Sequence, residues 1–240
     1  SGTVGDRLTN HDRPVFDIHQ IDADATRVMV KVTHNGKTHE EAAVFTNGQW
    51  SFSPSASWAD GAYQLVVVVE DLAGNVKESA PLEVRIDMTT TIDNIVLLTD
   101  TGVQGDQLTN VSEPSFRIDV PADVVQVRVT LDGGTSWSQV RKNADGQWIF
   151  ESPNTLGDGT HTLRVEATDE AGNIANKDLV FNIDTRIQVP TLALGAGQDT
   201  GANTADNITN ISRPTFTIGN VDPDVIKVLV TIDGHDYNAI

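Results

Sequence analysis

Aspartate residues stand at matching positions along this chain, mostly in turn sequences that also supply Asn amides and backbone carbonyls. Calcium takes about six to eight oxygen ligands of these kinds. We divide the candidate ligands into two sets, according to where along the chain they would meet. The first set is Asp6, Asp60, Asp87, Asp123 and Asp169, and the second is Asp100, Asp106, Asp158, Asp184, Asp222 and Asp224. Whether these carboxylates can meet depends on the elements that carry them.

A motif repeated three times sets the domain organisation. DTGVQGDQLTN, at residues 100–110, has counterparts in SGTVGDRLTN at the start of the chain and in DTGANTADNITN at 199–210. A Phe follows each copy, two residues after a Pro, and successive copies of this Phe lie 100 residues apart, at Phe16, Phe116 and Phe216. A repeat of that length is a domain and not a short solenoid unit.

The repeat therefore predicts three domains. They are residues 1–87, which lack the first strand, residues 92–184, and residues 190–240, which hold only the N-terminal part of a domain. We expect the third to have exposed strand edges and low stability alone.

Within each repeat, apolar and polar residues alternate over short stretches, which is the pattern of half-buried antiparallel strands. Residues 28–33 alternate in this way and lead to Asn35-Gly36, a hairpin signal that recurs at Asn47-Gly48. No stretch has a helical period. The pattern predicts an all-β chain of tandem immunoglobulin-like β-sandwich domains. Trp50 and Trp148 are expected to fill core volume, the alternative being an aromatic platform for carbohydrate.

A sandwich would gather the aspartates at its two ends. One pole of each sandwich would hold the motif loop, the loop with Asp60 or Asp158, and the strand end at Asp87 or Asp184. The opposite pole would hold the loop DLAGN (71–75) or DEAGN (169–173). Short linkers, 88–91 and 185–189, would then press acidic poles together, at a cost of about 1 to 4 kcal/mol per carboxylate pair. Calcium would neutralise them. The alternative is that Asp and Asn serve there only as turn residues.

Composition narrows the classes of function. Acidic residues outnumber basic ones 34 to 16, which gives a net charge of −18 and argues against nucleic acid and anionic membrane surfaces as partners. The chain has no cysteine, and its longest apolar run, residues 65–69, is far too short to span a membrane. Hydrolase, phosphate-loop and dinucleotide motifs are missing and the six His are scattered, so we expect no enzyme.

The order of motifs carries a resemblance. The chain resembles the bacterial Ig-like repeats of giant type I-secreted adhesins of the SiiE kind. The resemblance is carried by the successive motifs DTGxxGDxLTN, P-x-F, ADGQW, LGDGTHTL, DEAGN and a closing NID. The resemblance covers the whole chain and implies a secreted, monomeric stalk segment on the bacterial surface. It also implies calcium at the junctions, neighbouring repeats as partners in the same chain, a host-cell or surface ligand bound elsewhere, a role in virulence, and no membrane insertion.

This chain departs from the family pattern at three places. The first copy of the motif starts at Ser1, opposite Thr101, and so lacks the Asp that opens the second copy at Asp100. Met88 follows Asp87 where Thr185 follows Asp184, and the third repeat has no DxAGN loop. A complete calcium set is therefore expected only between repeats one and two. Two other functions are considered: a glycan- or receptor-binding module using an aromatic such as Trp137, and an accessory domain of a secreted hydrolase. We also expect the sequence to be a fragment, because it begins and ends within the repeat pattern.

Overall fold

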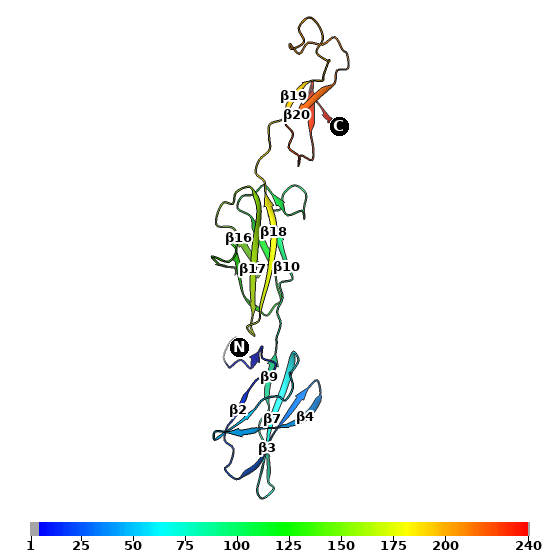
Figure 1. Cartoon of the computed structure of the whole chain (residues 1–240). Coiled ribbons are helices and arrows are strands. Elements are labelled where there is room, and N and C mark those ends of the chain that lie inside the picture. The colour runs from blue at the N-terminus through cyan, green and yellow to red at the C-terminus, as the bar shows by residue number, and fades with distance from the viewer. Residues whose placement is uncertain (1–4, 240) are drawn as a thin grey trace. The chain divides into compact units, whose positions relative to one another are not determined.

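A computed structural model describes residues 5–239 and contains only strands and loops there (Figure 1). The chain divides into two compact units, Ser1–Asp184 and Thr185–Ile240, which are described separately below. The first unit holds two sandwiches, one for each of the first two repeats. The predicted all-β fold with immunoglobulin-like sandwiches is confirmed. No helix in residues 5–239 is long and apolar enough to cross a membrane.

The first repeat packs two sheets face to face. Its larger sheet has the order β1-β9-β7-β3-β4, with β8 paired to β7, and its smaller sheet the order β2-β6-β5. The strands are β1 (Leu8–Thr9), β2 (Phe16–Ile18), β3 (Ala25–His34), β4 (Lys37–Ala42), β5 (Val44–Thr46), β6 (Gln49–Phe52), β7 (Gly61–Asp71), β8 (Val76–Glu78) and β9 (Leu82–Ile86). Strand β1 runs parallel to β9, whereas the other pairs are antiparallel.

The second repeat has the same plan with one more strand pairing in its smaller sheet. The sheets have the orders β11-β18-β17-β13-β14 and β10-β12-β16-β15. The strands are β10 (Asn94–Leu97), β11 (Leu108–Thr109), β12 (Ser115–Asp119), β13 (Val124–Thr130), β14 (Ser138–Gln139), β15 (Arg141–Lys142), β16 (Trp148–Glu151), β17 (Gly159–Asp169) and β18 (Ile174–Ile183). Strand β11 pairs in parallel with β18, as β1 does with β9.

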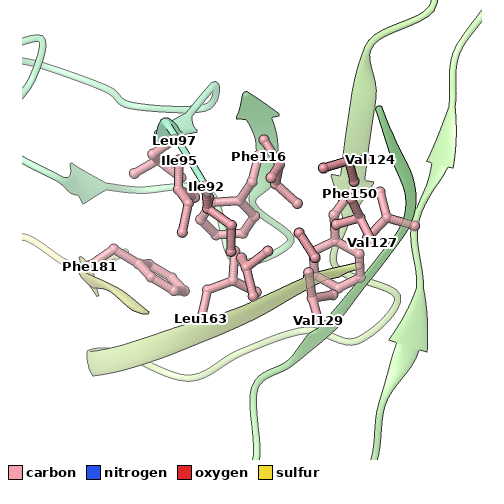
Figure 2. Close-up of a cluster of buried hydrophobic side chains, with 14 of the residues drawn as sticks. Ile92, Ile95, Leu97, Phe116, Val124, Val127, Val129, Phe150, Leu163 and Phe181 are labelled. Atoms are coloured by element: carbon pink, nitrogen blue, oxygen red, sulfur yellow. The ribbon is translucent and has the colours of Figure 1, made fainter. Parts of the chain in front are cut away.

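Alternating apolar residues on the inner faces of the two sheets form one core in each sandwich. In the second repeat, Phe116, Leu163 and Phe181 are fully buried among Val and Ile side chains (Figure 2). The hairpin prediction is correct, because Asn35 and Asn47 have φ values of 49° and 54° and each is followed by a Gly with positive φ. Such backbone angles favour Asn-Gly at two-residue turns.

The tryptophans occupy other places than the sequence pattern suggests. Trp50 and Trp148 lie half-buried at the edge of the cores; Trp50 packs on Phe45, and Lys142 lies over the ring of Trp148. Trp58 instead fills the core of the first repeat, with 6% of its surface exposed and its ring stacked on Tyr63.

The second unit contains two separate strand pairs. They join β19 (Thr191–Leu194) to β20 (Phe216–Gly219) and β21 (Leu229–Ile232) to β22 (His235–Asn238). Large apolar side chains remain exposed here, including Leu192 at 56%, Phe216 at 45% and Ile226 at 84%. Phe216 corresponds to the fully buried Phe116 of the complete sandwich, so this unit buries much less of its apolar surface.

Candidate functional site

The candidate site lies at the junction of the first two repeats and is centred on Asp87, the residue after β9. The amide of Asp87 donates to the Thr9 carbonyl oxygen at 2.9 Å, which fixes the residue at the end of the sheet. Only 8% of its surface is exposed. One Asp87 carboxylate oxygen lies 3.2 Å from Arg85 Nη2, and the Arg85 side chain is itself 58% exposed. An exposed cation therefore partly neutralises the charge of a buried carboxylate.

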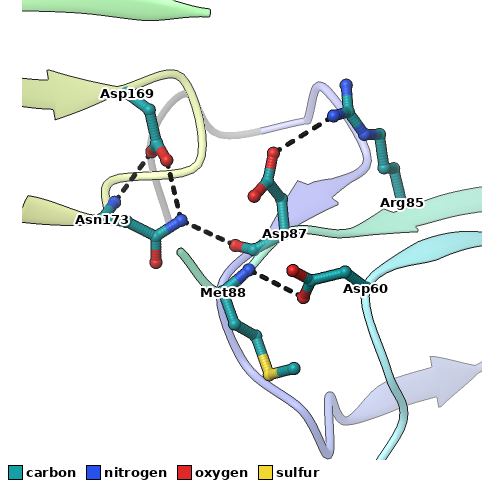
Figure 3. Close-up of polar contacts among 6 residues, drawn as sticks. All are labelled: Asp60, Arg85, Asp87, Met88, Asp169 and Asn173. Carbon is teal, nitrogen blue, oxygen red and sulfur yellow. Dashed lines mark hydrogen bonds and ion pairs between the residues drawn. The ribbon is translucent and has the colours of Figure 1, made fainter. Parts of the chain in front are cut away.

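The loop between β17 and β18 meets Asp87 from the second repeat. Asp169 is 2% exposed, and its carboxylate accepts hydrogen bonds of 2.8 Å from both the amide and the side chain of Asn173. The same Asn173 Nδ2 donates to the Asp87 backbone oxygen at 2.8 Å, so one side chain joins the two repeats (Figure 3). This contact brings the end of β9 and the DEAGN loop together.

The corresponding loop of the first repeat provides an internal comparison. Asp71 holds Asn75 with the same two contacts, at 2.8 Å to the amide and 2.7 Å to the side chain. Those hydrogen bonds lower the pKa of Asp71. The Asn75 side chain is exposed there, whereas Ala171 of the second loop is fully buried. The two loops therefore share the same Asp–Asn hydrogen bonds and differ in burial, and within residues 5–239 it is the second loop that donates a hydrogen bond to another repeat.

Negative charge accumulates around Asp87. Burial raises the pKa of its carboxyl group, and the carboxylates of Asp169, Asp123 and Asp60 raise it further, against the opposing effect of Arg85. Four of the five aspartates in the first set thus interact electrostatically at this junction. Removing charged groups from water and placing like charges together both disfavour ionisation, so the site would be stabilised by a cation.

The other members of the first set are placed differently. Asp60 is exposed, and its Oδ1 accepts a hydrogen bond of 3.0 Å from the Met88 amide. Asp123 is half-buried, and its backbone oxygen accepts from the Glu170 amide at 2.9 Å. Asp6 is exposed, and its carboxylate accepts from the Leu8 amide at 2.9 Å within its own turn.

The second set lies in part on the motif loop of repeat two. Asp100 Oδ2 accepts from the Gly105 amide at 2.7 Å, and Asp106 Oδ1 accepts from the Leu108 amide at 2.9 Å. The other carboxylate oxygen, Asp100 Oδ1, and the side-chain oxygen of Gln107 are buried without a hydrogen-bond partner. A buried acceptor without a donor is costly, and a bound cation is one group that could satisfy such an oxygen.

The remaining members of the second set divide between the two units. Asp184 follows β18 as Asp87 follows β9, and its amide donates to the Thr109 carbonyl oxygen at 3.0 Å. Asp158 lies on the exposed turn before β17. In the second unit, Asp222 Oδ2 accepts from the Gln188 amide at 2.6 Å, and Asp224 is exposed. The equivalent of Asp100 there, Asp199, also has a buried oxygen without a partner.

The described side chains do not form a closed metal cage. Among residues 5–239, no group of three or more His, Cys, Asp or Glu is placed so that it could hold a metal ion. The donor chemistry nevertheless suits calcium, since several carboxylates lie near Asp87 and oxygens without a hydrogen-bond partner occur in the motif loop. The residues therefore provide the type of ligand atom that calcium binds.

The repeats match a known family over the whole length of the chain. The family model described as bacterial Ig-like domain matches residues 1–89, 88–185 and 186–240. The chain belongs to the bacterial Ig-like domain family. The bacterial Ig-like repeats are arranged in tandem, without an intervening domain of another kind in the matched segments. None of the curated proteins matches the chain.

Solved structures similar to these bacterial Ig-like repeats include two adhesins. A 1.5-MDa bacterial ice-binding adhesin is 21% identical, with 80% of this chain and 65% of that chain covered at a TM-score of 0.39. A Ca²⁺-stabilized adhesin of an Antarctic bacterium is also 21% identical, with 82% and 51% covered at a TM-score of 0.42.

The fibronectin(III)-like modules of Clostridium thermocellum CbhA are 12% identical, with 73% and 87% covered at a TM-score of 0.37. TM-scores of this size indicate only a general similarity in fold. The bacterial Ig-like chain spans 65% and 51% of the lengths of the two adhesin chains.

Two residues important to this geometry are absent from the sequence-based sets. Asn173 bridges the repeats, and Gln107 presents an unsatisfied oxygen. A signal for Asn173 exists, because Asn closes both DLAGN and DEAGN. Gln107 could have been noticed from its place beside Asp106, but Arg7 and Asn207 occupy the same place in the other bacterial Ig-like repeats and share only its positive φ.

Proposed function

We propose that this chain is a stalk segment of a large bacterial surface adhesin, of the giant type I-secreted kind, and that calcium bound at repeat junctions stiffens it. Tandem repetition supports this proposal, since equal domains in series extend a chain without providing a single active site. In this proposal the segment is extracellular, catalyses no reaction and supports adhesion by a ligand-binding part located elsewhere in the protein.

The observation that carries the calcium proposal is the charge around Asp87. Its carboxyl group is buried, three other carboxylates raise its pKa, and the counter-charge that contacts it among residues 5–239 is the exposed Arg85. Calcium would replace Arg85 as the counter-charge and take oxygen ligands from Asp87 and Asp169. Asp60 and Asp123, on adjacent loops, would approach the ion from the two repeats.

A calcium ion at this place would couple the two repeats, because its ligands come from both. By mass action it would stabilise the folded junction by about 2.7 kcal/mol when its free concentration is a hundred times its dissociation constant. Holding ligands from both repeats would also limit the bending of the linker at residues 88–91.

The test is a calorimetric calcium titration of the full chain, paired with small-angle scattering with and without chelator. Binding that narrows the range of particle dimensions is expected. Asp87→Asn and Asp169→Asn should weaken binding, whereas Asp71→Asn, in the equivalent loop of repeat one, should not weaken binding at this junction. Unchanged calcium affinity in the first two variants would refute the site.

A binding role for Trp137 is less well supported. Arg128 lies 4.5 Å from the centre of its ring, and the side chain is half-buried. The ring face is therefore already used in a contact within the sandwich.

A further inference from the structure

Two aromatic rings lie together at the β5 edge of the smaller sheet of the first repeat. Phe45 of β5 pairs across the sheet with Trp50 of β6, and their ring centroids are 5.2 Å apart at an interplanar angle of 47°. Phe45 is 56% exposed, whereas Trp50 is half-buried and also packs against the core. Because Trp50 is anchored in this way, the pair presents a fixed apolar surface to solvent.

A hollow with a volume of about 430 Å³ is lined by these two rings and by polar side chains. The loop after β2 contributes His19, Gln20 and Asp22, and β6 contributes Gln49. All four side chains are exposed, and within residues 5–239 none of them makes a hydrogen bond to another residue. A concave site with an apolar wall and a few polar groups is the usual form of a small-molecule site.

The second repeat has a different set of residues at the corresponding place. Lys142 pairs with Trp148 there, and its Nζ lies 5.0 Å from the centre of the indole ring. Val120, at the position of Gln20, packs against the core, and Asp119, at the position of His19, accepts a hydrogen bond from Arg117. The second repeat therefore provides an internal comparison in which a cation replaces the exposed aromatic ring.

This edge of a sandwich stays open when another repeat precedes it. In the second repeat the turn at 143–147 is exposed and Trp148 is half-buried. The first repeat contacts the second elsewhere, at Asn173 of the DEAGN loop. A neighbouring repeat joined in this way therefore leaves the edge that carries Phe45 accessible to a ligand.

The chemistry of the hollow matches a neutral sugar. One face of a sugar ring carries C–H groups that pack on aromatic rings, while its hydroxyl groups both donate and accept hydrogen bonds. The amides of Gln20 and Gln49 do the same, and Asp22 accepts. Within residues 5–239 no Lys or Arg lines the hollow, and the net charge of the chain is −18, so an acidic sugar would be repelled. Aromatic rings also bind Pro-rich peptides, but the four exposed polar side chains favour a ligand rich in hydroxyl groups.

We propose that the hollow beside Phe45 and Trp50 binds a neutral saccharide. The two rings contact one face of a sugar ring, and Gln20, Gln49 and Asp22 form hydrogen bonds with its hydroxyl groups. This binding activity goes beyond the stalk function proposed above and does not depend on calcium at Asp87. It would give the first repeat a direct contact with glycans.

The experiment titrates the full chain with three neutral trisaccharides, maltotriose, cellotriose and galactotriose, and follows the amide signals by NMR. At least one of them is expected to shift the amide signals of residues 19–22 and 45–50, with a dissociation constant of about 1 mM or lower. Trigalacturonic acid has a carboxylate on each ring and is the matched control for galactotriose. It should leave these signals unchanged, because its charge has the same sign as that of the chain.

Variants at exposed positions test the two walls of the hollow. Phe45→Lys reproduces the Lys142–Trp148 pair and should weaken binding at least about tenfold, whereas Val44→Lys, on the opposite face of the same strand, should not. Gln20 has a φ of 61°, which Gly adopts freely, so Gln20→Gly removes the amide and keeps the loop conformation; it should weaken binding about threefold or more. Thermal unfolding checks that each variant is folded. Three outcomes would overturn the proposal: no shift with any neutral trisaccharide at about 10 mM, equal affinity of Phe45→Lys and the unaltered chain, or a decaproline peptide shifting these signals where the sugars do not.

Discussion

Replacing Asn173 by Ala should weaken the junction of the first two repeats far more than the same change at Asn75 weakens its own loop. Both side chains donate to the Asp that opens their loop, at 2.8 Å for Asn173 and 2.7 Å for Asn75. Only Asn173 also donates across the junction, to the Asp87 backbone oxygen at 2.8 Å. The comparison therefore isolates the contact between repeats and the effect of burial.

The expected magnitudes follow from these contacts. The hydrogen bond to Asp87 contributes about 1 kcal/mol, and leaving the buried Asp169 carboxylate short of a donor costs roughly another 1–3 kcal/mol. Asn173→Ala should therefore destabilise the second repeat by about 2–4 kcal/mol. A change of this size lowers the melting temperature of a domain of about 100 residues by on the order of 10 °C. At the exposed Asn75 we expect about 1 kcal/mol or less, because water can replace the lost donor.

Calorimetric melting of the full chain in chelator measures both losses, and ¹⁵N relaxation measures whether the two repeats tumble together. Asn173→Ala should make their tumbling more independent, and Asn75→Ala should leave it unchanged. Equal destabilisation by the two substitutions, or unchanged tumbling in Asn173→Ala, would show that the bond to Asp87 does not couple the repeats.

Three further predictions concern charge and packing. Folding raises the pKa of Asp87, so the folded state binds this proton more tightly than the unfolded state does. In chelator, the contribution of Asp87 to stability is therefore greatest at low pH. It falls as the pH rises through the pKa of the unfolded state and then that of the folded state. Asp87→Asn should flatten this dependence in melts between pH 3 and 7, and calcium should reverse it in the unaltered chain, since the ion binds the deprotonated carboxylate. Hydrogen bonds from Ser136 and Thr130 lower the pKa of Asp132, so its contribution to stability is present above the pKa of the unfolded state and is lost in strong acid. Asp132→Ala should therefore red-shift the fluorescence of Trp137, five residues further along the same loop, at neutral pH. An unchanged spectrum would count against this loop structure. Phe116→Ala should lower the free energy of unfolding, measured in urea, by about 3–5 kcal/mol. Phe16→Ala should lower it clearly less, because Phe16 is only half-buried. Equal losses would contradict the difference in burial between the two residues.

Much of the fold could be predicted because the strands have a period of two and the turns carry strong local signals. Asn35-Gly36 and Asn47-Gly48 sit in the left-handed backbone region that such hairpins need. The place of the tryptophans could not be predicted in this way. Trp50 alternates correctly with the core residue Phe52, yet it is only half-buried and packs against the edge of the core.

The candidate site could be predicted only in part. Asp87 and Asp169 stand out because an Ile-Asp strand end and a DxAGN loop must face each other if sandwiches join by a short linker. Which atoms then meet depends on the path of the linker and on side-chain rotamers. The sequence therefore indicated the acidic loops, but not that the amide of Asn173 makes the direct contact between repeats.

The exposed loop at 71–75 is held by hydrogen bonds within the loop itself. Its Asp accepts hydrogen bonds from the amides of Ala73 and Asn75 and from the Asn75 side chain, just as its buried counterpart holds Asn173. Such a loop is preorganised for docking, because little conformational entropy remains to be lost when a partner arrives. Domains can therefore be joined in series without either end refolding, and the strength of each joint can vary independently of the stability of the domains on either side.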